Sequence, residues 1–308
     1  MNPNEAKNKK AGRALLPKFM DSLKREKGDY AYAPIVQSVR EDKDLNMDFR
    51  GDQDYLNVYF KGHNVLQLYS GGKYEIAKDF RVEGMPPSLG SKNDVNKYLE
   101  LLPMIKDRVS RHPHKRTETE YEQLIIRANN REDNGSCYVV IDRAYSAWTN
   151  DKRNQWDLVA IGWPRKELQK KSPIGHLVLI EVKYGLNPDI GKVADQIERY
   201  GGHLKDHFGD ICTDMEKILH QKTELGLIER TEDQKKKLMK LKLNPMWDSC
   251  KMVVYLIDYN PNSTMEKDAI EGLQRLKKLE SEGPVSRGQI RIAKRGFAMW
   301  DQGLKPLD

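Results

Sequence analysis

Three charged residues interrupt two apolar runs of the chain, and together they could do chemistry. Asp157 lies in the run 155–163 (QWDLVAIGW), and Glu181 and Lys183 lie in 177–185 (LVLIEVKYG). A strand that is nearly continuous in Val, Ile and Leu is usually buried on both faces, so a charge inside it must be paired or must bind a metal. Because side chains alternate along a strand, Glu181 and Lys183 share one face.

Two carboxylates that converge beside a lysine suit hydrolysis of a phosphodiester. Asp157 and Glu181 offer the oxygen ligands that Mg²⁺ prefers, and Lys183 would neutralise or orient what binds beside the metal. Phosphodiester hydrolysis needs a metal-activated water, stabilisation of the charge of the transition state, and a cation near the attacking or leaving oxygen. We therefore expect a metal-dependent site at these residues.

The same residues resemble the catalytic motif of the PD-(D/E)XK nuclease superfamily. The matching segments are WDLV, with Asp157, and LIEVK, with Glu181 and Lys183, and the insertion 164–176 lengthens the spacing between them. The segment 196–200 (QIERY) is similar to the QxxxY helix of the branch that holds recombination nucleases and Holliday-junction-resolvase-like proteins. There is no proline before Asp157, and no cysteine quartet of the iron–sulfur variants, so the subfamily stays open.

The superfamily also places a glutamate on the helix before the first core strand. The segment 117–126 (TETEYEQLII) offers Glu118, Glu120 and Glu122 for that position. We select Glu122, because it precedes Ile125 by about one turn and so lies closest to the buried face of an amphipathic helix. The resemblance covers about residues 116–260.

The resemblance implies an Mg²⁺- or Mn²⁺-dependent nuclease that acts on nucleic acid, with DNA favoured over RNA, and that could cut as a homodimer. Lys183 would position or deprotonate the attacking water. The implied metal ligands are Glu122, Asp157, Glu181 and the backbone carbonyl of Val182, and the implied substrate-positioning residues are Gln196 and Tyr200.

Each motif also has a structural interpretation. Asp157 could end a strand, and Glu181 and Lys183 could form an exposed ion pair on an edge strand, which is worth about 0–1 kcal/mol. Tyr200 could be a core aromatic residue with its hydroxyl at the rim. Two other function classes follow: a catalytically inactive nucleic-acid-binding module with the same fold, and a partner-interaction protein. The lysine-rich segment 234–242 fits either a solvated helix face or contacts to phosphates.

The composition indicates a folded protein with a polyanionic partner. The net charge of +7 and the pI near 9.0 favour nucleic acid. Three widely spaced cysteines, Cys137, Cys212 and Cys250, suit a reducing compartment and have no metal-site spacing. No apolar stretch is long enough to cross a membrane, and the first residues lack the apolar centre of a secretory signal, so we expect a cytoplasmic protein without a membrane partner.

The periodicity predicts an α/β protein of the α+β type with a mixed sheet. We expect a restriction-endonuclease-like core with helices on both faces, preceded by a small antiparallel β unit. The expected divisions are a basic arm or short helix at 1–28, an antiparallel β-meander at 29–90, and a nuclease-like domain at 91–308 with a helical insertion at about 211–245.

Within these divisions the predicted elements are as follows. The meander strands lie within 52–80, with turns at 61–64 and 70–73, and a helix over 95–110 is capped by Ser91 or Asp94. The further helices are predicted at 117–131, 191–208 and 268–281, and the further strands at 136–147, 155–163, 177–185, 250–260 and 288–300.

Overall fold

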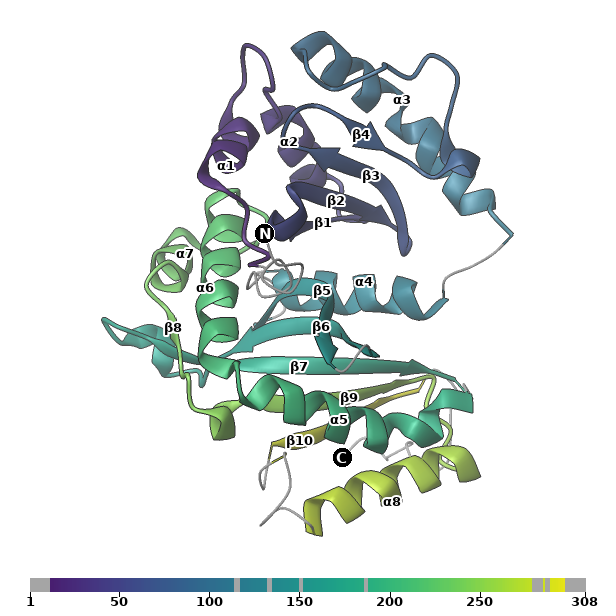
Figure 1. Cartoon of the computed structure of the whole chain (residues 1–308), viewed down its shortest axis with the longest axis vertical. Helices are drawn as coiled ribbons and strands as arrows, with labels where there is room; N and C mark the ends of the chain where they lie inside the picture. The colour runs from purple at the N-terminus through teal and green to yellow at the C-terminus, as the bar shows by residue number, and fades with distance from the viewer. Residues whose placement is uncertain are drawn as a thin grey trace, which may run out of the picture. The chain divides into compact units, whose positions relative to one another are not determined.

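The computed structural model describes most of the chain. The described residues are 12–113, 117–131, 135–149, 152–185, 188–278, 285 and 289–296. Its elements form a mixed α+β fold, as predicted, with one small antiparallel sheet and one mixed sheet (Figure 1). Across this described part of the chain, no helix is long and apolar enough to cross a membrane.

The chain divides into two compact units. The first comprises Met1–Ser136 and Thr213–Leu241, and the second comprises Cys137–Cys212 and Lys242–Asp308. This division differs from the predicted boundary at residue 91, because contacts tie the segments 92–136 and 213–241 to the meander.

Buried and long-range hydrogen bonds explain the difference. The hydroxyl of Tyr98, from the helix predicted to open the nuclease-like domain, donates to the carbonyl of Val65 in the meander at 2.9 Å. The side chain of Gln123 accepts from the amide of Gly62 and donates to the carbonyl of Tyr59. Composition and periodicity cannot reveal such side-chain contacts, so the boundary could not be placed from the sequence.

The first unit is built on a four-stranded antiparallel meander. The strands follow one another in the order β1-β2-β3-β4, so the predicted meander is confirmed. Their bounds are β1 Leu45–Arg50, β2 Tyr55–Phe60, β3 His63–Tyr69 and β4 Tyr74–Glu75. The sequence pattern did not predict β1, because Asp48 and Arg50 are charged at buried positions of this strand and hide the apolar alternation.

Helices accompany the meander in the first unit. They are α1 Pro17–Lys24, α2 Ala33–Glu41, α3 Lys92–Arg111, α4 Thr117–Asn130 and α7 Glu232–Leu238, and α6 Phe208–Glu224 begins in the second unit and continues into the first. The side chain of Ser91 accepts from the amide of Asp94 at 3.2 Å, so Ser91 caps α3 and Asp94 lies in its first turn. Helix α1 lies within 1–28, where a basic arm or a short helix was expected, and residues 1–11 lie outside the described part of the chain.

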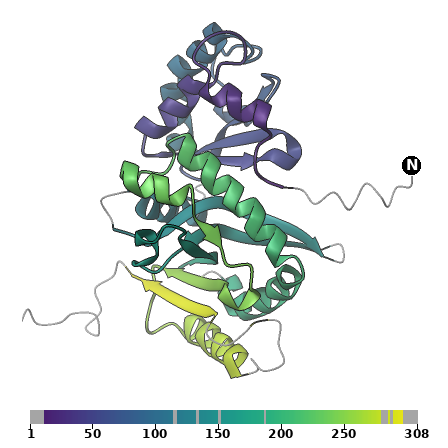
Figure 2. The ribbon, with the colours of Figure 1, turned by 90° about the vertical axis from the view of Figure 1, so that its left-hand side faces the viewer.

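The second unit is built on the mixed sheet. Its strands are β5 Tyr138–Thr149, β6 Lys152–Gly162, β7 Ile174–Tyr184, β9 Lys251–Ile257 and β10 Ile290–Arg295, in the order β10-β9-β7-β6-β5. Strands β5, β6 and β7 pair antiparallel, whereas β7, β9 and β10 pair parallel, and β10 runs beside β9 (Figure 2). The short strand β8, Lys242–Leu243, pairs with β7 inside the segment predicted as helical.

Helices α5 and α8 belong to the second unit with this sheet. Helix α5, Val193–Lys205, contacts β6 and helix α8, Thr264–Lys278. The strand β7 has neighbours on both sides, and its residues 177–180 are buried. The short 3₁₀ helices of the chain are η2 Gly51–Gln53, η3 Lys78–Phe80, η5 Glu167–Gln169, η6 Pro188–Lys192 and η7 Trp247–Ser249.

Candidate active site

Strand β7 carries Glu181 and Lys183 in the interior of the second unit. Its neighbours there are β6 and β9, and the register places Glu181 opposite Val254 and Lys183 opposite Leu256 of β9. Glu181 is only 3% exposed and Lys183 only 6%. The alternative of an exposed ion pair on an edge strand is therefore wrong.

The two charges neutralise one another. Nζ of Lys183 donates to Oε1 of Glu181 at 2.6 Å, as expected for side chains that share one face of a strand. Burial of an isolated charge is costly, whereas a paired and hydrogen-bonded charge is tolerated. This pairing explains, in part, how two charges can lie inside an apolar strand.

Asp157 on β6 lies directly beside this pair. Its Oδ2 accepts a hydrogen bond from the backbone N–H of Val182 at 2.7 Å. Val182 stands between Glu181 and Lys183, so the carboxylate of Asp157 contacts the backbone of the segment that carries both. Leu158, the next residue, pairs with Ile180 across the two strands, which fixes the register that brings Asp157 there.

The charge of Lys183 also acts on Asp189, in the η6 helix that follows β7. The hydrogen bond from Lys192, at 2.9 Å, lowers the pKa of the Asp189 carboxyl, and the ammonium of Lys183 lowers it further. Asp189 is exposed, and its side chain is 55% accessible. Lys192 is therefore the main cause of the lowered pKa of Asp189, and Lys183 is a minor one.

The predicted substrate-positioning residues lie on α5. The ring of Tyr200 is 5.5 Å from the ring of Trp156, edge to face, and Tyr200 is 7% exposed, so it packs in the core as its structural interpretation requires. Trp156 immediately precedes Asp157, so helix α5, which carries Gln196 and Tyr200, packs on strand β6, which carries Asp157. Among the described residues Oε1 of Gln196 is buried without a hydrogen-bond partner, which is a feature of sites that hold an unseen water or ligand.

Glu122 lies on α4, in the first unit. It is 4% exposed, whereas Glu118 and Glu120 are half-buried, so the choice of the glutamate nearest the buried face agrees with the burial. Asp157, Glu181 and Lys183 all belong to the second unit. The membership of Glu122 in one metal site with them stays a prediction.

The donor set of the second unit suits a hard cation. Magnesium commonly binds through one or two carboxylates and keeps several waters, and Asp157 and Glu181 supply two carboxylates. Within the residues that the structure describes, no group of three or more His, Cys, Asp or Glu side chains is arranged to hold a metal ion. The predicted carbonyl ligand belongs to Val182, whose side chain is fully buried.

One buried carboxylate near this site was missed in the sequence. Asp142 on β5 is 1% exposed and pairs with Val159 of β6. Residues directly opposite share a face, and Val159 lies two residues after Asp157, so Asp142 and Asp157 are on the same face of the sheet. The signal was present, because Asp142 ends the apolar run VVI of 139–141 in the same way that Asp157 interrupts its own run.

A scan against models of known protein families finds no match to this chain, and a search of curated proteins finds none with significant similarity. Assignment of a function therefore depends on the residues described above and on the contacts among them.

Proposed function

We propose that this protein is a metal-dependent nuclease that hydrolyses phosphodiester bonds of DNA. The observation that carries the proposal is the contact of the Asp157 carboxylate with the backbone of Val182, directly beside the buried pair of Glu181 and Lys183. Two carboxylates and one ammonium are thereby gathered on two adjacent strands. This is the equipment that phosphodiester hydrolysis requires.

Stability alone is a poor reason for this arrangement. A buried ion pair recovers much of its desolvation cost but is often no more stabilising than apolar residues of similar volume. An apolar residue at both positions would avoid the cost of burying charge, as at residues 177–180 of the same strand, which are Leu, Val, Leu and Ile. A catalytic role, which needs a carboxylate and an ammonium at one place, accounts for the retained charges.

The chain's residues have distinct roles in this proposal. Asp157 and Glu181 would hold Mg²⁺ or Mn²⁺, with Glu122 and the Val182 carbonyl as the further ligands that the superfamily resemblance implies. The metal would supply Lewis acidity and a bound water of lowered pKa. When the metal binds Glu181, the ammonium of Lys183 would bind the attacking water or the charged phosphate oxygens instead. The side-chain oxygen of Gln196 would accept a hydrogen bond from water or substrate.

The choice of nucleic acid as substrate rests on charge. The net charge of +7 raises the local concentration of a polyanion and favours its association. DNA is favoured over RNA by the resemblance alone.

The decisive experiment replaces Glu181 by Gln and measures cleavage of a labelled DNA duplex and of a single strand at saturating Mg²⁺. A carboxamide is a far poorer ligand than a carboxylate, so Glu181→Gln should abolish cleavage but keep most of the affinity for DNA. Because the variant also leaves the buried Lys183 without its carboxylate, it should be less stable, and cleavage is compared below its melting temperature, where thermal melting shows that it is folded. Glu271→Gln is the matched control, because Glu271 is exposed on α8 of the same unit. Cleavage by Glu181→Gln at the rate of the control would sink the assignment.

A further inference from the structure

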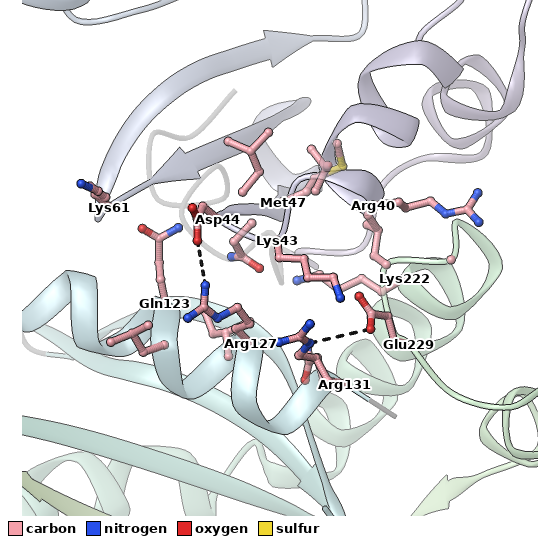
Figure 3. A pocket seen from close by; sticks show the side chains of 18 of the residues that line it. Arg40, Lys43, Asp44, Met47, Lys61, Gln123, Arg127, Arg131, Lys222 and Glu229 are labelled. Atoms are coloured by element: carbon pink, nitrogen blue, oxygen red, sulfur yellow. Dashed lines mark hydrogen bonds and ion pairs between the residues drawn. The ribbon is translucent and has the colours of Figure 1, made fainter. Parts of the chain in front are cut away.

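A second polar site lies entirely within the first unit, as a pocket of about 180 Å³ (Figure 3). Strand β1 and the residues before it, helix α4, and the segment that follows α6 contribute its walls. We call it the basic pocket, after its six cationic lining residues: Arg40, Lys43, Lys61, Arg127, Arg131 and Lys222. None of them belongs to the candidate active site.

The most buried cation of the basic pocket is already neutralised. Lys222 is 3% exposed, and its Nζ lies 2.7 Å from Oδ1 of Asp48, which is itself fully buried. The other oxygen of Asp48 accepts from Nδ2 of Asn46 at 2.8 Å. This network fixes Lys222 in place and matches its charge with one carboxylate.

The outer cations are only partly matched. Arg127 donates to Oδ1 of Asp44 at 2.7 Å, and both of these side chains reach solvent. Nε of Arg131 is 4.0 Å from Oε2 of Glu229, which is beyond hydrogen-bond reach. This Nε is buried and has no hydrogen-bond partner among the described residues. Arg131 therefore has an unused donor in the pocket.

The charges of the lining leave an excess of about two. Besides Lys222, which Asp48 neutralises, five cations line the pocket, against the three carboxylates Asp44, Glu120 and Glu229. Figure 3 shows Lys43 and Arg131 directed into the same space, and in the described part of the chain Lys43 makes no ion pair. Like charges held this close repel one another, and an anion would relieve the repulsion.

Apolar side chains also line the basic pocket. They belong to Val39, Leu45, Met47, Leu124, Ile126 and Leu227. Leu124 is 41% exposed although it is a large aliphatic residue. A bare inorganic anion would gain nothing from such a wall, whereas an anion attached to a base or sugar would bury apolar surface against it.

We propose that the basic pocket binds a phosphate monoester attached to an organic body, as in a free mononucleotide or the 5′-phosphorylated end of a nucleic acid. A phosphate monoester carries about −1.5 to −2 charges at pH 7, which matches the excess, whereas an internal phosphodiester carries about one. Lys43 and Arg131 hold the phosphate, and the apolar residues pack against the base or sugar. The inference does not rest on the proposed nuclease activity.

The test measures binding by calorimetry in EDTA, on the full chain with Glu181→Gln, so that no cleavage can interfere. The probes are AMP, adenosine, and a short DNA strand with either a 5′-phosphate or a 5′-hydroxyl. AMP or the 5′-phosphorylated strand should bind, and adenosine and the 5′-hydroxyl strand should bind at least about tenfold more weakly, since a charged hydrogen bond is worth about 1.5–3 kcal/mol. If AMP binds and the phosphorylated strand does not, the ligand is a free nucleotide. If the phosphorylated strand binds more tightly, the ligand is the 5′ end of a nucleic acid.

Variants locate the site. Lys43→Gln and Arg131→Gln should each weaken binding of the phosphorylated probe about tenfold or more. Lys97→Gln removes the same charge from an exposed position of α3 outside the pocket and should leave affinity unchanged. Thermal melting of all three variants checks that they fold. Equal affinity for phosphorylated and unphosphorylated probes, or pocket variants that bind like Lys97→Gln, would overturn the proposal.

Discussion

Two buried lysine–carboxylate pairs, one in each unit, have almost the same geometry and different surroundings. The Lys183–Glu181 pair spans 2.6 Å and the Lys222–Asp48 pair 2.7 Å, and all four side chains are less than a tenth exposed. The first pair lies within one strand, two residues apart, beside the further carboxylate of Asp157. The second pair joins strand β1 to helix α6 over 174 residues of sequence.

The difference shows that burial of an ion pair does not by itself identify a catalytic site. The Lys222–Asp48 pair links distant segments of the first unit, as a structural contact does. The Lys183–Glu181 pair joins two residues of the same strand, and it lies beside a third charged group, Asp157. We therefore expect the first unit's pair to act on stability and the second unit's pair to act on catalysis.

The largest effect is expected when the structural pair, Lys222–Asp48, is broken. Lys222→Met should lower the free energy of unfolding by about 3–5 kcal/mol, because it leaves the charge of Asp48 buried and uncompensated. Folded molecules of this variant should still cleave DNA at the rate of the unmodified protein. Urea denaturation measures the first quantity, and single-turnover cleavage at low temperature measures the second.

The double variant Asp48→Asn, Lys222→Met provides the control. It removes both charges, so it should recover a large part of the stability that Lys222→Met loses. A double variant no more stable than the single one would mean that Lys222 stabilises the unit by packing and not through Asp48. If folded Lys222→Met does not cleave DNA, the Lys222–Asp48 pair is also needed for activity and is not only structural.

The next effect concerns the catalytic pair. Lys183→Arg and Lys183→Ala should both lose on the order of 10²-fold or more in cleavage, as for removal of a positioned electrostatic or proton-transfer group. An ammonium can be held at one point and can give up its proton when desolvated, whereas a guanidinium is a larger planar group that stays protonated. Single-turnover cleavage at saturating Mg²⁺ measures the loss.

Calorimetric Mn²⁺ binding accompanies that measurement and should survive in both Lys183 variants, because the carboxylates remain. Full activity of Lys183→Arg would mean that Lys183 only neutralises Glu181. The two pairs of the molecule would then be of one kind, and the comparison between them would fail.

The two pairs also mark how far the sequence allows prediction. Glu181 and Lys183 are two residues apart in an apolar run, and strand alternation alone places them on one face. Asp48 and Lys222 are brought together only by the tertiary fold, and the sequence of β1 alone does not show that its carboxylate has a buried partner. The meander turns at 61–64 and 70–73 could be predicted for the same local reason, since Gly62 and Gly72 adopt positive φ there.

The contact of Asp157 with Val182 required more than local information. The insertion 164–176 separates the two strands, so no turn rule fixes their register. The resemblance to a known motif predicted that Asp157 and Glu181 converge, and the pairing of Leu158 with Ile180 places them on adjacent strands. Asp142 also interrupts an apolar run, but it matches no known motif, so the sequence analysis did not select it.

A smaller effect, on the affinity for DNA, is expected from the lysines of helix α7. The helix α7 begins with a capping box from Thr231 to Gln234, and Lys235, Lys236 and Lys237 follow in its last turn. Lys235 pairs with Glu232 at 2.8 Å on the surface, where such a pair contributes little. If these lysines bind phosphates, their replacement by Gln should flatten the log–log salt dependence of DNA binding by about 0.9 for each phosphate that is no longer neutralised.

The measurement is DNA affinity between low and moderate salt, with Lys97→Gln as the control of equal charge type. An unchanged slope would mean that these lysines do not contact phosphates and that the segment 234–242 is a solvated helix face. Lys235, Lys236 and Lys237 would then contribute to solubility and not to DNA binding.

The smallest effect comes from a buried carboxylate that makes no ion pair with any residue the structure describes, although the charge of Lys294 acts on it. Glu266 on α8 is 1% exposed, Oε2 accepts from the amide of Asn260 at 2.8 Å, and Oε1 has no hydrogen-bond partner among the described residues. Burial raises the pKa of Glu266 above its usual value, Asn260 opposes the shift, and Asp258 adds to it. A raised folded-state pKa contributes stability that is complete below the unfolded pKa and is lost as the pH rises through the folded pKa.

Glu266→Gln should therefore stabilise the protein above that window and not below it. Because the pKa of Glu266 is raised in the folded protein, the neutral amide should raise the free energy of unfolding at pH 8, and the difference between the two proteins should be smaller at pH 4. The amide oxygen can still accept from Asn260. Urea denaturation of both proteins at the two pH values measures this, with Glu271→Gln as the exposed control. A variant less stable at pH 8 would mean that the hydrogen bond from the Asn260 amide needs the charge of the carboxylate, so that this buried carboxylate, like Asp48, stabilises its unit through a partner.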